Sequence, residues 1–513
     1  MLVANRRPTK GHSTQNRHSL KHRPGATMYW AILHILAVAL PTTAFATNHA
    51  CKVVESKIPG RISYPGTTTY NSSIASYYGD QERALSPNCI FRPTTTAEVS
   101  EFVKLMTSNN STSKFAVRGG GHTFWTGAAN IESGITVDLR LINQVELSED
   151  KTIARIGGGA VWDIAYSQLV PYNLTVMGGR IPGIGVGGFA TGGGITFASR
   201  EHGFSCDNIH GYEVVLGSGE VVYVDQRSHP DLWLALKGGS NNFGIVTRFD
   251  VATIPQGKMW YSMLNYNYTN ATLWAHAKAF SDFMKPENHD GAAMMGMFLD
   301  YVEGKLLLSD AMWYTREVEE PAVYDAFTEI PNLGGVAELN TTDNVVANFG
   351  ENIPSKVDRG FQLTFSFNNP EPSVYMQLFK IWEKGLSKIA KVEGIFVEFL
   401  VQPHPVTNGT NMFGLTPGKT DDVMVDMTAA YTNTADDALV KAVITDIVNQ
   451  QRALLKAHGH LIDFIYLNYA DISQKVLQSW GADNVAKLRA VSKRYDPKGV
   501  FQKQVPGGYK IPM

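Results

Sequence analysis

Glycine is concentrated in clusters along the middle of this chain, and these clusters limit the possible folds more than any other feature. The stretches VRGGGHTFW (117–125), GIGVGGFATGGG (183–194) and KGGSNNFG (237–244) each hold at least three glycines. Glycine accepts a positive φ and lets two backbone segments approach closely, so such clusters interrupt helices and strands. We therefore expect many short elements joined by tight turns.

The first cluster places a histidine, His122, directly after a turn suited to an anion. Successive backbone N–H groups in such a turn can point at a phosphate. One glycine-rich turn is equally consistent with a surface turn that carries an incidental histidine. Two such loops in one module would let a long diphosphate ligand pass close to the backbone.

The order of apolar patterns predicts an α+β chain of two parts. Up to about residue 255, short β-rich runs alternate with glycine turns, and the strand, GxGxxG, helix order of a Rossmann unit is absent. Beyond it, longer patterns predict helices that cover one face of an antiparallel sheet. The expected helices span 96–106, 160–170, 271–284, 374–389, 438–459 and 484–495; the expected strands lie within 115–118, 135–139, 152–159, 212–224, 244–254, 294–314, 361–367 and 394–402.

The N-terminus is typical of a secretory signal. A basic segment precedes the apolar run 30–40, and Ala44-Phe45-Ala46 offers a small-residue cleavage site, so residues 1–46 are the predicted signal, with Met28 as an alternative start. An uncleaved anchor or a core helix are the alternatives. Export also agrees with eight N-x-S/T sequons, at Asn71, Asn109, Asn110, Asn173, Asn267, Asn270, Asn340 and Asn408.

Three cysteines and a modest charge complete the general description. An oxidising compartment would let Cys51 and Cys89 pair, leaving Cys206 as a small buried hydrophobe.

Without the six basic residues before Met28, acidic side chains exceed basic ones by about eight. Such a charge does not favour nucleic acid or an anionic membrane as partner. The histidines are scattered and no paired-cysteine spacing occurs, so no metal site is predicted.

The motifs RGGGHT, GIGVGGFATGGG, HGFSCDN, GGSNNFGIVTRF, YLNYAD and YDPKGVF, in this order, resemble the berberine-bridge-enzyme-like flavoproteins of the vanillyl-alcohol oxidase superfamily. The resemblance covers most of residues 89–501. It implies a PCMH-type FAD-binding domain at 47–255, a substrate-binding domain at 256–460, and a C-terminal segment, 461–513, that returns to the first domain.

The same resemblance implies that the cofactor is FAD and that its 8α-methyl is bonded to the imidazole of His122. The expected cofactor-binding residues are Arg118, Gly119, Gly120, Gly121, His122, Thr123, Ile184, Gly185, Val186, Gly187, Gly188, Gly192, Gly193, Ile245, Val246 and Asn468.

Two positions of the second glycine stretch set this chain apart within the resemblance. Many members carry a second flavin bond from a cysteine, and Ile181 stands in its place here, so a single covalent attachment is expected. Ile184 matches a residue whose bulk is associated with oxygen access: valine resembles oxidases, whereas isoleucine leaves dehydrogenase behaviour open. Dioxygen is the expected acceptor.

The stretch IYLNYAD supplies the expected catalytic residues, Tyr466 and Tyr469. On a strand, Tyr466 and Asn468 would share one face and Tyr469 the other. A tyrosine acts as acid or base only if its pKa is lowered locally, and a tyrosine packed as core is the alternative. Some family members place a glutamate base on the substrate sheet, but that role is not assigned to Glu398 here, and His404 is expected in a loop.

The predicted function is therefore that of a secreted FAD-linked oxidase. It would oxidise a small molecule, such as a secondary-metabolite intermediate, an alcohol or an amine, by hydride transfer to the flavin. A carbohydrate oxidase or dehydrogenase, an oxidative cyclase and an inert secreted flavoprotein are the alternatives.

Overall fold

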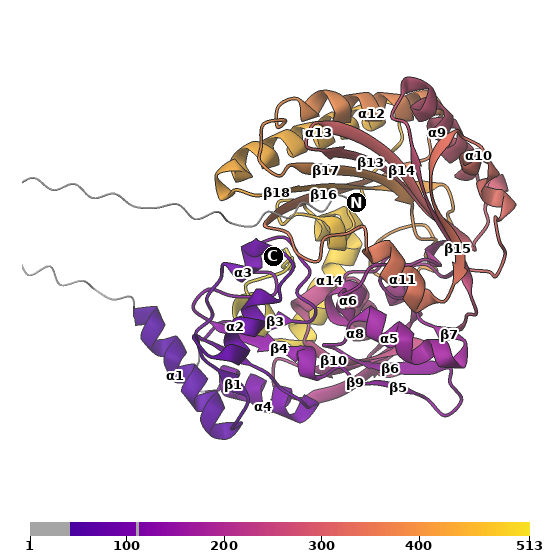
Figure 1. Ribbon diagram of the computed structural model, residues 1–513. Coiled ribbons are helices and arrows are strands. Elements are labelled where there is room, and N and C mark those ends of the chain that lie inside the picture. Colours follow the sequence, from indigo (N-terminus) through magenta and orange to yellow (C-terminus); the bar gives the residue numbers. More distant parts are fainter. Residues whose placement is uncertain (1–41, 109–111, 513) are drawn as a thin grey trace, which may run out of the picture. The chain divides into compact units, whose positions relative to one another are not determined.

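The computed structural model describes residues 42–108 and 112–512 (Figure 1). Most of the predicted signal, the alternative start at Met28, and the sequons at Asn109 and Asn110 lie outside the described residues. The predicted cleavage site coincides with the start of helix α1 (Thr42–Lys57).

The first part of the chain builds two sheets from short strands, as the glycine pattern predicts. A four-stranded sheet has the order β1-β2-β4-β3, and β4 pairs in parallel with both neighbours that flank it. A five-stranded antiparallel sheet has the order β5-β6-β10-β8-β9. The strands are β1 (Ile62–Ser63), β2 (Cys89–Phe91), β3 (Phe115–Arg118), β4 (Ile135–Asp138), β5 (Val145–Leu147), β6 (Ile153–Gly157), β8 (Ile209–Val215), β9 (Val221–Asp225) and β10 (Ile245–Ala252), with β7 (Leu174–Thr175) and β11 (Ile254–Pro255) as a separate pair.

Short helices connect and cover these strands. The predicted helices at 96–106 and 160–170 are confirmed as α4 and α5. The second glycine stretch, expected only as loops, contains the one-and-a-half-turn helix α6. The helices of this part are α2 (Thr68–Ala75), α3 (Asp80–Arg83), α4 (Thr96–Thr107), α5 (Trp162–Leu169), α6 (Val186–Thr191), α7 (Ser199–His202) and α8 (Pro230–Leu236).

The second part is an eight-stranded antiparallel sheet of order β15-β12-β14-β13-β17-β18-β16-β19. The predicted hairpin at 294–314 and the strands at 361–367 and 394–402 are confirmed, while β12, β15 and β18 had not been predicted. The strands are β12 (Met259–Tyr266), β13 (Ala293–Val302), β14 (Lys305–Tyr314), β15 (Asn332–Asn340), β16 (Arg359–Asn368), β17 (Phe396–Pro403), β18 (Asp422–Tyr431) and β19 (Leu461–Ile462).

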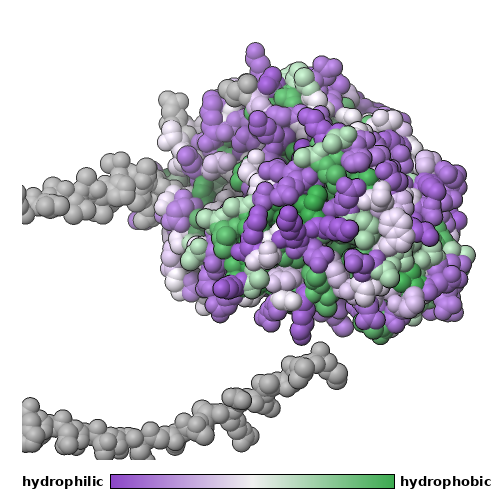
Figure 2. Space-filling model, turned by 90° about the horizontal axis from the view of Figure 1, so that it is seen from above, coloured by the Kyte–Doolittle hydropathy of each residue, from purple (hydrophilic) through white to green (hydrophobic). Residues whose placement is uncertain are grey.

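Helices cover one face of this sheet, as predicted (Figure 1). On β17 the alternate residues Val397, Phe399 and Val401 pack into the core shared with the helices, whereas Leu400 joins the core of the first part. From outside, hydrophilic residues predominate and hydrophobic ones are interspersed (Figure 2). The covering helices are α9 (Asn270–Phe283), α12 (Pro372–Leu386) and α13 (Asp437–Ala457); α10 (Asp325–Thr328) and α11 (Thr342–Gly350) lie in connections.

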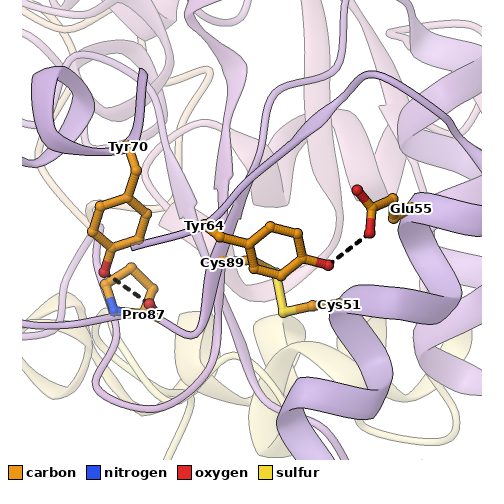
Figure 3. Close-up of a disulfide and its surroundings, with 6 residues drawn as sticks. All are labelled: Cys51, Glu55, Tyr64, Tyr70, Pro87 and Cys89. Carbon is orange, nitrogen blue, oxygen red and sulfur yellow. Dashed lines mark hydrogen bonds between the residues drawn. A yellow bond between two sulfur atoms is a disulfide. The ribbon is translucent and has the colours of Figure 1, made fainter. Parts of the chain in front are cut away.

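The predicted disulfide between Cys51 and Cys89 is present and joins helix α1 to strand β2 (Figure 3). Beside it, the Tyr64 hydroxyl donates to Glu55 at 2.9 Å, and the Tyr70 hydroxyl donates to the Pro87 carbonyl oxygen at 2.8 Å. Cys206 is free and fully buried, as expected for a structural cysteine.

The last fifty residues run from the large sheet back to the first part. After β19 pairs with β16, helices α14 (Ala482–Tyr495) and α15 (Val500–Lys503) follow. The Phe115 N–H of β3 then donates to the Gln504 carbonyl oxygen at 2.8 Å, and the rings of Phe115 and Phe501 meet edge to face. The end of the chain therefore supports the strand that leads into the first glycine loop.

Candidate active site

The first glycine loop leaves strand β3 at Arg118, whose side chain supports the loop from behind. Its guanidinium is fully buried and donates to the carbonyl oxygens of Ser73 at 2.7 Å and Ser76 at 2.9 Å. It also lies 3.6 Å from the ring centroid of Tyr77. Arg118, expected among the cofactor-binding residues, is thus committed to protein partners and holds the turn at Gly121, where φ is +78°.

Three glycine segments converge at this point: 119–121, 157–159 and 185–188, together called the glycine cradle. A Cβ on Gly120 would lie 2.6 Å from the Gly185 nitrogen, and one on Gly187 would lie 2.9 Å from the Gly158 oxygen. Real Cβ atoms do not approach so closely, so these backbones touch because no side chain intervenes. Residues 157–159, which had been interpreted only as the end of a strand, are the part of the cradle that the sequence analysis missed.

One glycine of the cradle faces open space. Gly188 is exposed, and a Cβ built on it would meet no described atom within 4 Å. Its neighbour Val186 is buried instead and donates its N–H to the Ala160 carbonyl oxygen at 2.9 Å. Ile245 and Val246 are buried too, and Val246 contributes its backbone oxygen to the contact with Gly158. The cradle therefore offers backbone rather than side chains to a ligand.

His122 follows the first loop and is stacked on Tyr78. The two ring centroids are 3.9 Å apart and the ring planes differ by 14°. Burial lowers the pKa of His122 to about 4, so the imidazole is neutral near pH 7 and keeps a nitrogen lone pair. The next residue, Thr123, turns its carbonyl oxygen toward Gly79.

The two isoleucines of the second stretch take different places. Ile184 is partly buried, accepts the Trp162 N–H at its carbonyl oxygen at 3.0 Å, and lies against Gly179. Ile181 packs against the apolar core of the first part. Neither side chain carries a nucleophilic atom.

The prediction that Tyr466, Asn468 and Tyr469 alternate along a strand is wrong. Residues Leu467–Tyr469 form a 3₁₀ turn, and because such a turn brings residues three apart to the same side, the rings of Tyr466 and Tyr469 meet edge to face at 4.9 Å. Asn468 donates to the Tyr466 hydroxyl at 3.1 Å and to the Phe189 carbonyl oxygen at 3.0 Å.

The two tyrosines have different surroundings. The Tyr466 hydroxyl is buried and also accepts the Gly194 N–H at 3.0 Å, so it supports the glycines at the end of the second stretch, 192–194. Gly192, in the same run, lies against Asn468. The Tyr469 hydroxyl instead accepts from Arg180 at 3.0 Å and from Gln402 of β17 at 3.3 Å. Burial raises the pKa of both phenols, and Arg180 opposes this at both.

Four polar residues form a cross-strand row on the face of the large sheet opposite the helices. Asp300 of β13 lies opposite Glu398 of β17, which lies opposite Thr428 of β18, which lies opposite Gln362 of β16. Asp426, two residues before Thr428, accepts from Gln362 at 2.7 Å and from Thr428 at 3.1 Å. We call Asp300, Glu398 and Asp426 the carboxyl row.

Hydrogen bonds only partly offset the burial of the three carboxyls in this row. The buried Oδ1 of Asp300 has no hydrogen-bond partner among residues 42–108 and 112–512. Burial raises the pKa of Asp300 to about 7; burial, together with the neighbouring Asp300 and Asp426, raises that of Glu398 well above its usual range. Burial likewise raises the pKa of Asp426 to about 7, although the hydrogen bonds from Gln362 and Thr428 act to lower it. Carboxylates on directly paired residues of neighbouring strands repel each other unless they share a proton or accept a hydrogen bond from a donor.

Arg180 and Tyr78 lie between the glycine cradle and the carboxyl row and interact with residues of both regions. Arg180, which follows Gly179 in the second stretch, reaches Tyr469 and lies 5.3 Å from the ring of Trp313 on β14. Burial, with a smaller contribution from the carboxyl of Glu398, raises the pKa of Tyr78, which is stacked on His122, to about 12. His404, expected in a loop, does follow β17 outside regular structure, and it is buried.

Comparisons with known proteins agree with this arrangement. The FAD binding domain family matches residues 87–225, and the berberine and berberine-like family matches residues 465–505. The chain is 35% identical over 484 residues to the FAD-dependent monooxygenase sdcF of Emericella nidulans, covering 91% of this chain and 99% of that protein. The chain belongs to the berberine and berberine-like family. It is an FAD-dependent oxidoreductase, as predicted.

Other relatives and solved structures extend the comparison. The FAD-dependent monooxygenase tpcD of Cochliobolus heterostrophus is 32% identical over 466 residues, covering 87% of this chain and 89% of that one. BBE-like 1 of Physcomitrella patens has the same fold, with a TM-score of 0.74 at 20% identity over 90% of this chain and 99% of its own. The glucooligosaccharide oxidase of Acremonium strictum follows with a TM-score of 0.71 at 17% identity, over 91% and 98%. The predicted PCMH-type α+β fold is thus confirmed.

The residues present fit FAD. The glycine cradle offers backbone free of side chains, Gly188 leaves space for a ligand, and His122 presents a neutral imidazole at the end of the first loop. Across the part of the chain that the structure describes, no cluster of three or more His, Cys, Asp or Glu side chains could hold a metal ion. No helix formed by the described residues is long and apolar enough to cross a membrane.

Proposed function

We propose that this protein oxidises a small secondary metabolite with FAD attached covalently through His122 alone. The observation that carries the proposal is the neutral His122 imidazole beside the glycine cradle, with Ile181 at the position where a second attachment would need a nucleophile. The Acremonium strictum oxidase is described as carrying a 6-S-cysteinyl, 8α-N1-histidyl FAD. This chain has the residue for only the second of those bonds.

The carboxyl row is the proposed proton acceptor. A general base works best when its pKa lies near the working pH. Asp300, whose pKa burial raises to about 7, meets this condition, and its opposite neighbour Glu398 also has a raised pKa; Tyr469, with a raised pKa, stays protonated. Tyr466 is held by Gly194 and Asn468 and serves the scaffold.

The substrate would lie between the cradle and the carboxyl row. The Asp300 carboxylate, with Glu398 opposite it, would take the one proton of a substrate O–H or N–H, and Tyr469, oriented by Arg180 and Gln402, would donate a hydrogen bond to a substrate oxygen. Bound FAD supplies the acceptor for the hydride that leaves the adjoining carbon. The relatives named as monooxygenases make a fungal metabolite the favoured substrate class, and the oligosaccharide oxidases are more distant.

Dioxygen is the proposed final acceptor, with Ile184 beside its path. Oxidase and monooxygenase outcomes differ in the fate of oxygen: an oxidase releases hydrogen peroxide, whereas a monooxygenase incorporates one oxygen atom into the product. Turnover under ¹⁸O₂, with peroxide measured in parallel, separates them. Flavin that is reduced by dithionite and stays reduced in air would contradict both.

The attachment has its own test. Acid-precipitated wild-type protein should keep its flavin, digestion should give a flavin-bearing peptide that contains His122, and His122→Ala should release its flavin in acid. Flavin that washes off the wild-type protein, or travels with a peptide from residues 178–188, would overturn the proposed attachment.

We also propose that the protein is exported. A disulfide favours an oxidising compartment, and the sequons Asn71, Asn173, Asn267, Asn270 and Asn408 are exposed. Asn340 is half-buried. The proposed domains are 47–255 for FAD, 256–460 for substrate, and 461–513 as the returning segment. Glycosidase-sensitive protein in the medium of a fungal host supports export; purely intracellular, unglycosylated protein contradicts it.

A further inference from the structure

Tyr78 is fixed at the junction of the first glycine loop and the large sheet. It lies between α2 and α3, its N–H donates to the Gly121 carbonyl oxygen at 3.0 Å, and its own carbonyl oxygen accepts the Val357 N–H at 3.0 Å. Both bonds use the backbone, so the chain is held here whatever the side chain is. The position of the ring is therefore set by two segments that are far apart in the sequence.

The Tyr78 ring contacts two rings of the first glycine loop, those of His122 and Phe124. One contact is the near-parallel stack on the imidazole, at 3.9 Å and 14°. Phe124 meets the ring at 5.5 Å with its plane tilted by 50°, and Phe124 itself lies against Gly360 of β16. These neighbours leave the aromatic ring little freedom to turn.

We propose that Tyr78 is a positioning residue that fixes the plane of the His122 imidazole for attachment to the flavin. The inference rests on the proposed function, because it presumes that His122 carries the flavin. The in-plane lone pair of an imidazole nitrogen lies at the ring edge, so a stack on the ring face orients the nucleophile without consuming its lone pair. A hydrogen-bond donor at the same place would occupy that lone pair.

Attachment requires an oriented, neutral imidazole because of its chemistry. A bond forms between an imidazole nitrogen and the 8α carbon, one C–H bond of the 8α-methyl breaks, and one N–H bond of the imidazole breaks. The two protons go to solvent, and the two electrons enter the flavin ring. Dioxygen, the proposed acceptor of this protein, takes up those electrons and two protons as hydrogen peroxide.

Apoprotein variants test the inference without any substrate. Tyr78→Leu removes the aromatic face, and Tyr78→Phe keeps it while losing only the hydroxyl. Each apoprotein is mixed with FAD in air, and covalent flavin is followed by fluorescence on denaturing gels while total bound flavin is measured in parallel. An aromatic pair contributes about 0.5–1.5 kcal/mol, so Tyr78→Leu should attach flavin about two- to twelvefold more slowly than the wild type. Tyr78→Phe, which keeps the ring, should attach flavin at nearly the wild-type rate.

The outcomes separate the inference from the proposal beneath it. No covalent flavin on the wild-type protein would refute the attachment itself. Covalent flavin formed equally fast on wild type and Tyr78→Leu would refute only the role of Tyr78. If Tyr78→Leu folds poorly, Tyr78→Met, which fills similar space without a ring, takes its place. If Tyr78→Leu and Tyr78→Met both lose total FAD binding, rather than attaching bound FAD slowly, Tyr78 is a structural residue and the inference is overturned.

Discussion

A methyl group on Gly188 is the sharpest test of the glycine cradle. Gly188 lies in α6 and is exposed, and its Cβ would meet no described atom within 4 Å. Alanine exceeds glycine in helix propensity by about 1 kcal/mol, so Gly188→Ala should leave the apoprotein as stable or slightly more stable. If FAD occupies the open space, however, the methyl group meets the ligand.

The magnitudes follow from the packing. An inserted methyl group in a filled site costs about 1–3 kcal/mol, which corresponds to roughly five- to 150-fold weaker FAD binding. Gly185→Ala is the matched variant, because its Cβ would lie 2.6 Å from the Gly120 Cα, so the two loops must separate. It should lose about 1–3 kcal/mol of protein stability as well as FAD.

Both variants are best studied with His122→Ala, in which FAD binding is expected to be reversible. The dissociation constant of FAD is measured by flavin fluorescence, and the stability of the apoprotein by thermal unfolding. For a chain of this size the unfolding entropy is about 1 kcal/mol per kelvin, so Gly188→Ala should change Tm by about 1 °C at most and Gly185→Ala should lower it by about 1–3 °C. Unchanged FAD affinity in Gly188→Ala would show that Gly188 does not face the cofactor and refute the cradle as described.

Three further predictions concern the disulfide, oxygen and pH. Replacing Cys51 and Cys89 by serine opens a crosslink with a sequence separation of 38, which the chain-entropy model values at about 4 kcal/mol; Tm should fall by about 4 °C, and an unchanged Tm would contradict the estimate. Ile184→Val should speed flavin reoxidation in stopped flow and leave reduction unchanged, whereas equal changes in both half-reactions would point to the flavin potential. The carboxyl of Asp426 ionises near pH 4 when unfolded and near pH 7 when folded, so its ionisation increasingly favours unfolding across that interval, by up to the order of 4 kcal/mol. Asp426→Asn should therefore gain Tm relative to wild type as the pH rises from 4 to 8, and a pH-independent difference would contradict this.

Local sequence patterns were sufficient to predict those features of the fold that depend mainly on a single segment or on residue type. The glycine clusters predicted the turns, the 3.6-residue periodicity predicted α9, α12 and α13, and Cys51 with Cys89 predicted the crosslink. The strands β12, β15 and β18 escaped prediction. Strand β18 carries Asp426 and Thr428 on the polar face of an otherwise apolar run, and β15 is an edge strand with mostly exposed residues. Neither shows the regular alternation of a half-buried strand.

The sequence by itself determined the chemistry that each segment can offer: a backbone free of side chains, a histidine after the first loop, and no nucleophile at Ile181. Only the tertiary structure decided which segments meet. The 3₁₀ turn at 467–469 brought together two tyrosines that were expected on opposite faces, and strand register placed Asp300 opposite Glu398 although they are far apart in the chain. Arg180 likewise owes its place beside Tyr469 to that assembly. Local conformation depends on neighbouring residues, but the pKa of a carboxyl and the partner of a hydroxyl depend on burial and on contacts between distant segments, which pattern alone does not specify.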